Sequence, residues 1–222
     1  MSLVMTPFQY FCFLFALFLL PILISSRDPD PLQDFCVGNL KAQPISVNGF
    51  PCKPEEDVTS EDFFFDGLME EGNTTNKFGY FVSRGHVLNF PGVNTLGISM
   101  NRVDIAPGGL NYPHSHPRSS EAGVVIKGKV LVGFITTNGK YFSKVMTSGQ
   151  MFVVPPGLVH FQLNVGKKKA LLFTSFNSQL PGSVVVATSL FATNPVVPDT
   201  VLMKAFQADK DLISKLRSHL QY

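Results

Sequence analysis

Short apolar or β-branched segments follow one another through the second half of the chain, each only a few residues long. They lie at 124–126, 130–135, 151–154, 170–176 and 183–190. Turn signals rich in glycine or proline separate them, such as Lys127-Gly128, Ser148-Gly149 and Pro155-Pro156-Gly157. Many short strands at this spacing predict an all-β sandwich or barrel.

Other local patterns agree with this fold class. Asn138-Gly139 lies between two of the apolar runs and is a strong hairpin signal. Only the end of the chain looks helical, because Asp199 and Asp209 can each cap a short segment with apolar residues on one face. We therefore expect helices within 199–220, packed on their own barrel or on a neighbouring subunit.

The first residues predict a secretory signal rather than part of the fold. Residues 8–24 read FQYFCFLFALFLLPILI, two serines follow, and the first charge is Arg27. We expect cleavage near Ser26, so that residues 1–26 are the signal peptide and residues 27–222 form one domain. Within that domain the barrel should span about 60–198. The alternative is an uncleaved signal anchor, because the apolar run approaches the length that spans a bilayer.

The composition of the mature chain fits an extracellular protein. Cys36 and Cys52 remain after cleavage, and an even cysteine count in a secreted chain predicts a disulfide. Asn73-Thr74-Thr75 is a glycosylation sequon in a polar stretch. The net charge is only +2 and the densest basic cluster is three lysines, so we expect no nucleic-acid partner and, after cleavage, no membrane.

Three histidines and one glutamate fall within two patterned segments. His114 and His116 stand two residues apart, a spacing that places both on one face of a strand. Glu121 follows across a bend, and His160 comes after the turn Pro155-Pro156-Gly157. A barrel can bring these four groups together, which predicts a metal site. His86 and His219 lie outside these segments, and we expect them at the surface.

The donor set narrows the choice of metal. Three imidazoles and a carboxylate with open positions suit six-coordinate Mn²⁺ or Fe²⁺, whereas structural zinc prefers four ligands and often cysteine. A redox-capable metal open to small ligands indicates chemistry on O₂, superoxide or a small carboxylate.

Both segments match the motifs of the cupin superfamily. Residues 108–128 read Gly-x5-His-x-His-x4-Glu-x6-Gly, and residues 149–164 read Gly-x5-Pro-x-Gly-x2-His-x3-Asn. Five further stretches resemble the plant germins and germin-like proteins, so that the resemblance covers essentially the whole mature chain. These stretches are 31–37, 47–53, 99–104, 161–166 and 175–179.

The resemblance implies a secreted, glycosylated cupin jelly-roll of the plant apoplast and cell wall. It implies manganese held by His114, His116, Glu121 and His160, a Cys36–Cys52 bridge, and a hexamer built as a trimer of dimers. Germins proper oxidise oxalate with O₂ to CO₂ and H₂O₂, some germin-like relatives dismutate superoxide, and the family is associated with defence. A non-catalytic cell-wall or receptor-associated protein is the third possibility, and a two-barrel seed-storage cupin fits less well.

The resemblance also points to substrate-binding residues and to two departures. Asn101 and Asn111 match the asparagines with which oxalate oxidases hold their substrate near the metal, and their amides could hydrogen-bond a dicarboxylate. Tyr112 stands where germins typically have proline, and Ser119-Ser120 replaces Ala-Thr before Glu121. Neither change removes a ligand, but the tyrosine ring could alter access to the metal.

Overall fold

The computed structural model describes residues 6–7, 34–42 and 48–220 of the chain. The predicted signal peptide and its cleavage site therefore lie almost wholly outside the described residues. Among those residues, no helix has the length and apolar character needed to cross a membrane.

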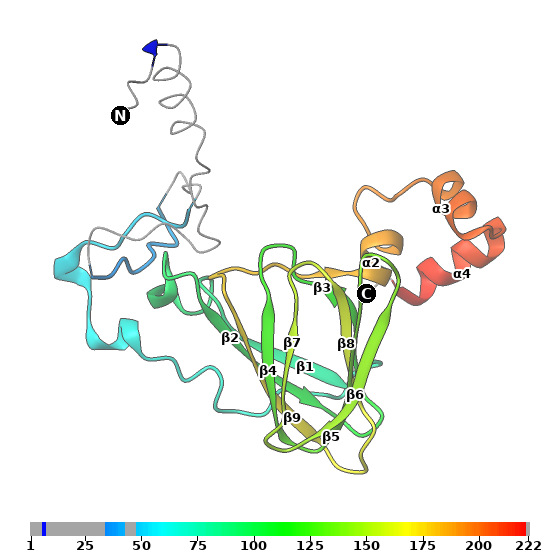
Figure 1. The fold of residues 1–222 in the computed structure, drawn as a ribbon, viewed down its shortest axis with the longest axis horizontal. Helices are drawn as coiled ribbons and strands as arrows, with labels where there is room; N and C mark the ends of the chain where they lie inside the picture. Colours follow the sequence, from blue (N-terminus) through cyan, green and yellow to red (C-terminus); the bar gives the residue numbers. More distant parts are fainter. Residues whose placement is uncertain (1–5, 8–33, 43–47, 221–222) are drawn as a thin grey trace.

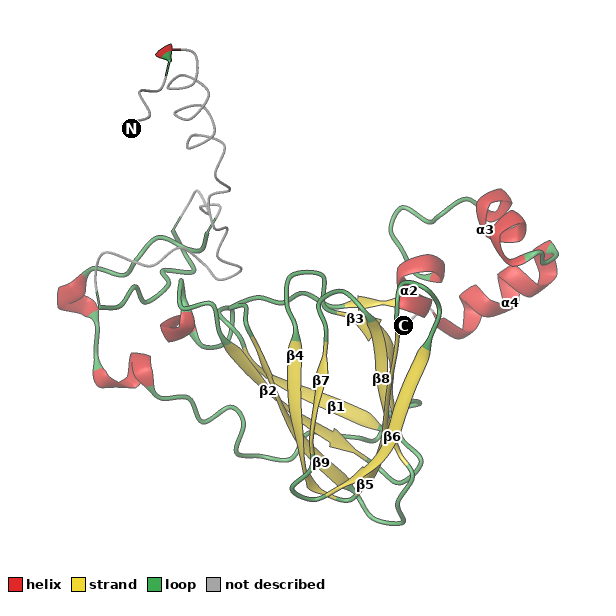
Figure 2. Ribbon diagram, viewed as in Figure 1, coloured by secondary structure: helices red, strands yellow, loops and turns green. Residues whose placement is uncertain are grey.

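Two antiparallel five-stranded sheets face each other, as the turn pattern predicted, and form the jelly-roll that the resemblance implied (Figures 1 and 2). One sheet has the order β1-β2-β9-β4-β7 and the other β10-β3-β8-β5-β6. The strands are β1 (Tyr80–Gly85), β2 (Ser99–Ile105), β3 (Leu110–Ser115), β4 (Glu121–Lys127), β5 (Lys129–Ile135), β6 (Tyr141–Thr147), β7 (Met151–Val154), β8 (Val159–Asn164), β9 (Ala170–Phe176) and β10 (Val184–Val185).

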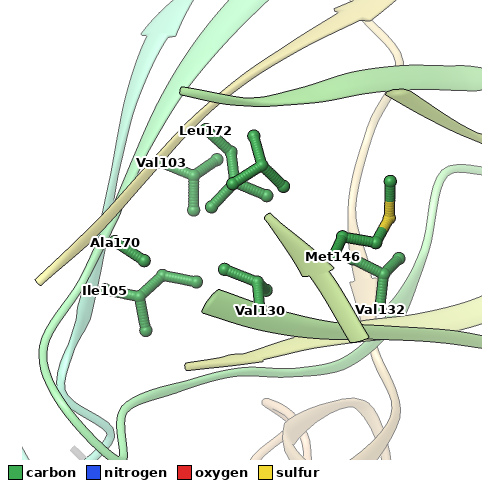
Figure 3. Close-up of a cluster of buried hydrophobic side chains, with 8 residues drawn as sticks. Val103, Ile105, Val130, Val132, Met146, Ala170 and Leu172 are labelled. Atoms are coloured by element: carbon green, nitrogen blue, oxygen red, sulfur yellow. The ribbon is translucent and has the colours of Figure 1, made fainter. Parts of the chain in front are cut away.

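A compact apolar core lies between the two sheets (Figure 3). Ile105, Leu172 and Val130 are fully buried there, and they come from β2, β9 and β5. Alternation along each strand supplies these residues from both sheets, as the period-two rule requires. The core therefore joins the inner faces of the two sheets.

The predicted hairpin at Asn138-Gly139 is confirmed. Strand β5 pairs antiparallel with β6, and Ile135 stands opposite Tyr141 across the turn. Gly139 has φ of +80°, a conformation that favours glycine, and this explains why the turn needs that residue.

The expectation of a strand through the apolar run at 183–190 was wrong. Only Val184 and Val185 form a strand, and helix α2 (Val186–Phe191) follows at once. Phe191 is buried with Leu202 and Ile213 of the later helices in a second small core. Packing against these helices thus outweighs the strand preference of the β-branched residues before it.

The two predicted terminal helices are present as α3 (Asp199–Phe206) and α4 (Lys210–Leu220), and with α2 they lie beyond the end of the barrel (Figure 1). Asp209 accepts a hydrogen bond from the Leu212 amide at 2.8 Å, so its predicted capping role is confirmed. Asp199 is not a cap: it is the first helical residue after Pro198, and its carboxylate pairs with Arg217 at 2.9 Å.

A disulfide between Cys36 and Cys52 closes a loop within the lead-in to the barrel. Asn94, itself fully buried, donates to the Phe50 carbonyl at 2.8 Å and accepts from the Phe50 amide at 3.0 Å. Asn94 lies between β1 and β2, so these hydrogen bonds attach the bridged segment to the barrel. Short 3₁₀ helices lie at Glu55–Asp57, Ser60–Phe63 and Pro91–Val93.

Candidate metal centre

The four predicted ligands come from three strands and the loop after β3. His114 lies in β3 and stands directly opposite His160 of β8, while His116 follows just beyond the end of β3. Glu121 is the first residue of β4, which belongs to the facing sheet. The site therefore lies between the two sheets, where a barrel gathers residues distant in sequence.

The structure brings these four side chains together, and all four are buried. One potential ligand atom from each lies within 4.8 Å of those from the others. A Glu121 carboxylate oxygen lies 2.9 Å from His160 Nε2 and 3.0 Å from His116 Nε2. The imidazole rings of His114 and His160 are 4.2 Å apart between centroids. This is the compactness that a single ion requires.

The second nitrogen of each imidazole fixes which nitrogen faces the centre. Nδ1 of His114, His116 and His160 lies 2.8, 2.6 and 2.9 Å from the carbonyls of Tyr112, Gly182 and Leu158. A carbonyl only accepts, so each Nδ1 carries the proton and each neutral ring presents a lone pair at Nε2. The Nε2 lone pairs of His116 and His160 then face a Glu121 carboxylate oxygen, and these electron-rich atoms repel one another. A cation between them would remove this repulsion, because all three atoms could coordinate it. The residues present therefore fit a divalent metal.

Electrostatics favour the protonation states that bind metal. Burial, followed by repulsion from His160, lowers the pKa of His114 from 6.5 to about 4, so its ring is neutral near pH 7. Burial alone would raise the pKa of Glu121, but the imidazoles of His116 and His160, which are polar partners of the carboxylate when they are protonated, outweigh burial and lower that pKa to about 2. Neutral imidazole and ionised carboxylate are the forms that coordinate a metal.

A polar network extends from the ligands to the predicted substrate residues. Gln162, fully buried on β8, donates to Glu121 Oε1 at 3.3 Å and accepts from Asn111 Nδ2 at 2.6 Å. Asn101 and Asn111 are themselves buried. Both line a cavity of about 220 Å³ together with His114, His116 and Glu121. The two asparagines and the metal ligands thus border one small space.

No role was assigned to Gln162 from the sequence. The signal was its position two residues from a ligand on the same strand, which puts both side chains on one face. Tyr80, Val82 and Arg84 of β1 also line this cavity, and they were not foreseen, because no local pattern links β1 to the motifs.

The residues that depart from the germin pattern have defined contacts. Ser119 Oγ donates to Asn177 Oδ1 at 2.9 Å, and the Ser120 amide donates to the same oxygen at 2.9 Å. These bonds hold the turn that delivers Glu121. Tyr112 lines the metal cavity, and its ring lies 4.5 Å from that of Phe78.

Neither remaining histidine joins the cluster. His219 is exposed on α4, as predicted. His86 is half-buried rather than on the surface, and its Nδ1 is buried with no hydrogen-bond partner among the described residues. Burial lowers the pKa of His86, and the positive charge of Arg84 lowers it further. A backbone hydrogen bond partly opposes these two effects.

Comparison with known proteins decides the family. Residues 66–214 match the model of the Cupin family. The chain is 59% identical over 211 residues to germin-like protein subfamily T member 2 of Arabidopsis thaliana, a match that covers 95% of this chain and 94% of that protein. The chain belongs to the germin-like proteins of the cupin superfamily.

Oxalate oxidases are also among the similar proteins. Oxalate oxidase 2 of Hordeum vulgare is 47% identical to this germin-like protein, over 92% of this chain and 93% of that protein. A solved oxalate oxidase in complex with the substrate analogue glycolate superposes with a TM-score of 0.84 and 47% identity. That superposition covers 87% of this germin-like protein and 98% of the solved chain.

Proposed function

We propose that this germin-like protein is a secreted manganese enzyme that oxidises oxalate. The observation that carries the proposal is the sharing of one cavity of about 220 Å³ by the ligand cluster and the amides of Asn101 and Asn111. A site that only bound metal for stability would not need buried amides beside the open side of the cluster. The similarity to oxalate oxidases supports the same reading.

Manganese is the ion that we assign to the cluster. Three neutral imidazoles and one carboxylate suit a six-coordinate ion with positions open to small ligands, and the described cluster includes no cysteine that would favour zinc. Bound at these four residues, manganese would supply a Lewis acid and a redox centre.

The side chains of the cavity would bind and orient the substrate. Asn101 can donate an amide N–H to a carboxylate oxygen of the substrate. Asn111, which is held by its hydrogen bond to Gln162, lines the same cavity. In the reaction oxalate gives up two electrons and its carbon–carbon bond breaks to release two molecules of CO₂. O₂ takes up the two electrons and two protons and leaves as H₂O₂.

An oxalate-dependent peroxide assay on the purified manganese-loaded protein tests this function. We expect peroxide from the wild type, none from His114→Ala, and a large loss in Asn101→Ala with the metal still bound. Metal content measured on each variant separates loss of the ion from loss of substrate binding. Peroxide no higher than in the His114→Ala control would refute oxalate oxidation.

Superoxide dismutation is the second candidate. It is favoured by the engagement of the Asn111 amide, which donates to Gln162 at 2.6 Å and so is already used within the protein. Superoxide needs the metal and its four ligands but no substrate-binding amide. Asn101→Ala should therefore spare dismutation while greatly reducing oxalate oxidation, and the two assays on that variant discriminate between the candidates.

We also propose export to the apoplast and glycosylation at Asn73. The Cys36–Cys52 disulfide is typical of proteins that pass through an oxidising compartment, and Asn73 is exposed. Release of peroxide in the cell wall would fit a role in defence. A mobility shift that is lost in Asn73→Gln, in protein recovered from the extracellular fluid of plant tissue, would support both proposals.

A hexameric trimer of dimers is the assembly that we propose. The sheet containing β1 and β2 carries an apolar groove of about 710 Å³. Phe64 and Val153 on the walls of the groove are 71% and 60% exposed. Helices α3 and α4 lie beyond the barrel and expose Val201, Phe206 and Leu212 (Figure 1). Apolar surface on this scale marks protein interfaces. Light scattering at a mass of one chain would contradict the hexamer.

A further inference from the structure

An aromatic seam joins the two sheets beside the metal cavity. Strand β1 is the edge of its sheet, and β10 covers β3 only at His114 and Ser115. Further along β3, the rings of Tyr112 and Tyr80 meet edge to face with centroids 5.3 Å apart. These two side chains therefore close the barrel where no strand pairing does.

Two cavities lie against this seam. The metal cavity measures about 220 Å³, and a second cavity, here called the outer cavity, measures about 540 Å³. Tyr80, Val82, Arg84 and Tyr112 line both, so these four residues form the wall between them. The outer cavity falls within the size range of small-molecule sites, whereas the metal cavity is smaller than that range.

The lining of the outer cavity is aromatic and cationic. Phe78, Tyr80, Phe81 and Tyr112 supply rings, Lys77 and Arg84 supply positive charge, and no acidic residue contributes. Such a lining attracts an anion with a planar apolar body.

The two cations differ in what they already contact. Lys77 Nζ donates to the His219 carbonyl at 2.7 Å and lies 5.2 Å from the centroid of the Phe78 ring. Arg84 is exposed, and within residues 34–42 and 48–220 its guanidinium has no ion pair or hydrogen bond. Arg84 also stands opposite Asn101 in the β1–β2 ladder, which fixes its strand position beside the metal cavity. A rigid strand thus presents a guanidinium that is open to a carboxylate.

We propose that the outer cavity is a binding site for an aromatic carboxylate. The Arg84 guanidinium pairs with the carboxylate, and the ring of the ligand packs against Tyr80 and Tyr112. This site lies across Tyr112 from the metal ligands and does not use the metal, so it stands independently of the proposed oxidase activity.

Benzoate titrated into the full purified protein, with and without manganese, tests this proposal. The chain has no tryptophan, so Tyr80 and Tyr112 contribute to an intrinsic fluorescence that comes from tyrosines alone. Calorimetry gives the affinity. We expect saturable binding of equal affinity in both forms. Arg84→Gln should weaken it about tenfold or more, because a charge-assisted hydrogen bond is lost. Tyr112→Phe should bind as the wild type does, and Tyr112→Ala more weakly.

Two controls keep the test specific. Lys144→Gln removes an exposed cation on β6, far along the chain from the seam, and should leave the affinity unchanged. Neutral benzamide should bind much more weakly than benzoate. Melting curves of Arg84→Gln confirm folding, which loss of an exposed side chain should not disturb.

Three results would overturn the proposal. The first is the absence of saturable binding. The second is benzoate binding that needs manganese and ignores Arg84→Gln, because the metal would then be the site. The third is binding that emerges only in Tyr222→Ala, because the end of the chain would then be the natural occupant of the cavity.

Discussion

At the scale of single residues, protonation and hydrogen bonding decide whether the cluster can hold a metal. Each imidazole donates a hydrogen bond from Nδ1 to a backbone carbonyl, so Nε2 is the nitrogen that faces the centre of the cluster. Gln162 extends the same control to the carboxylate by donating to Glu121 while accepting from Asn111. The backbone and one amide therefore orient the whole donor set.

Gln162→Leu should weaken metal binding by roughly 10- to 100-fold, the usual effect of losing a partner that orients a ligand. The variant leaves Glu121 Oε1 and Asn111 Nδ2 without this partner, although it keeps all four ligands. Chelator competition measures the affinity. Gln207→Leu on an exposed turn is the matched control. Equal affinity in both variants would show that Gln162 does not orient Glu121.

Acid should destabilise the metal-free protein between about pH 6.5 and 4. The unfolded chain protonates His114 near its ordinary pKa of 6.5, whereas the folded chain does so only near about 4. The unfolded state therefore binds more protons in this window, and stability falls as pH falls. The loss from this residue is at most about 3 kcal/mol. Urea unfolding at several pH values in this window, compared with His114→Gln, measures it. An equally steep profile in that variant would exclude His114 as the cause.

At the scale of elements, the end of β8 ties the barrel together. Asn164, the last residue of the second motif, donates Nδ2 to the carbonyls of Ile105, Ala106 and Lys168 at 2.9–3.0 Å. Its Oδ1 accepts from the Gly166 amide at 2.9 Å. The motif thus joins a metal ligand, His160, to a structural residue four positions later.

Asn164→Asp should lower the free energy of unfolding by roughly 1–3 kcal/mol, because the variant keeps the acceptor but loses the donors to buried carbonyls. Thermal unfolding measures this loss. Metal affinity, measured separately, should change little, because Asn164 does not contact the ligands. An unchanged melting temperature would contradict the structural role.

The sequence predicted what local spacing controls. Turn signals located most strands of the barrel, because turns depend on neighbouring residues alone. The His-x-His spacing brought His114 and His116 to one site, although His116 lies just beyond the end of β3 rather than on the strand. The wall formed by Tyr80 and Arg84 could not be predicted, because it depends on which strand pairs with β2. The secondary structure of residues 183–190 also depended on residues distant in the sequence, since Leu202 and Ile213 pack against Phe191 at the end of α2.

At the scale of the whole molecule, the fold consists of a barrel, which contains an apolar core and the ligand cluster, and of segments attached to the outside of the barrel. The apolar core around Ile105 and Leu172 lies between the two sheets (Figure 3). The ligand cluster lies between the same two sheets. The disulfide-bridged lead-in and the terminal helices lie outside the barrel (Figure 1). Stability can therefore change at the attached segments while the metal site stays intact.

Replacing both Cys36 and Cys52 with serine should cost about 3 kcal/mol of unfolding free energy, the stabilisation expected for a loop closed over 16 residues. Denaturant unfolding of the metal-free protein measures the loss. Metal stoichiometry should stay unchanged, because the bridge contacts none of the ligands. Loss of the metal together with the bridge would contradict this separation.

Elemental analysis of the purified protein, recovered from extracellular fluid, tests the central claim most directly. The account predicts about one manganese per chain in the wild type and in the Gln207→Leu control, and almost none in Glu121→Ala. A folded wild-type protein without manganese, or a Glu121→Ala variant that keeps it, would contradict the assignment of His114, His116, Glu121 and His160 as a manganese site.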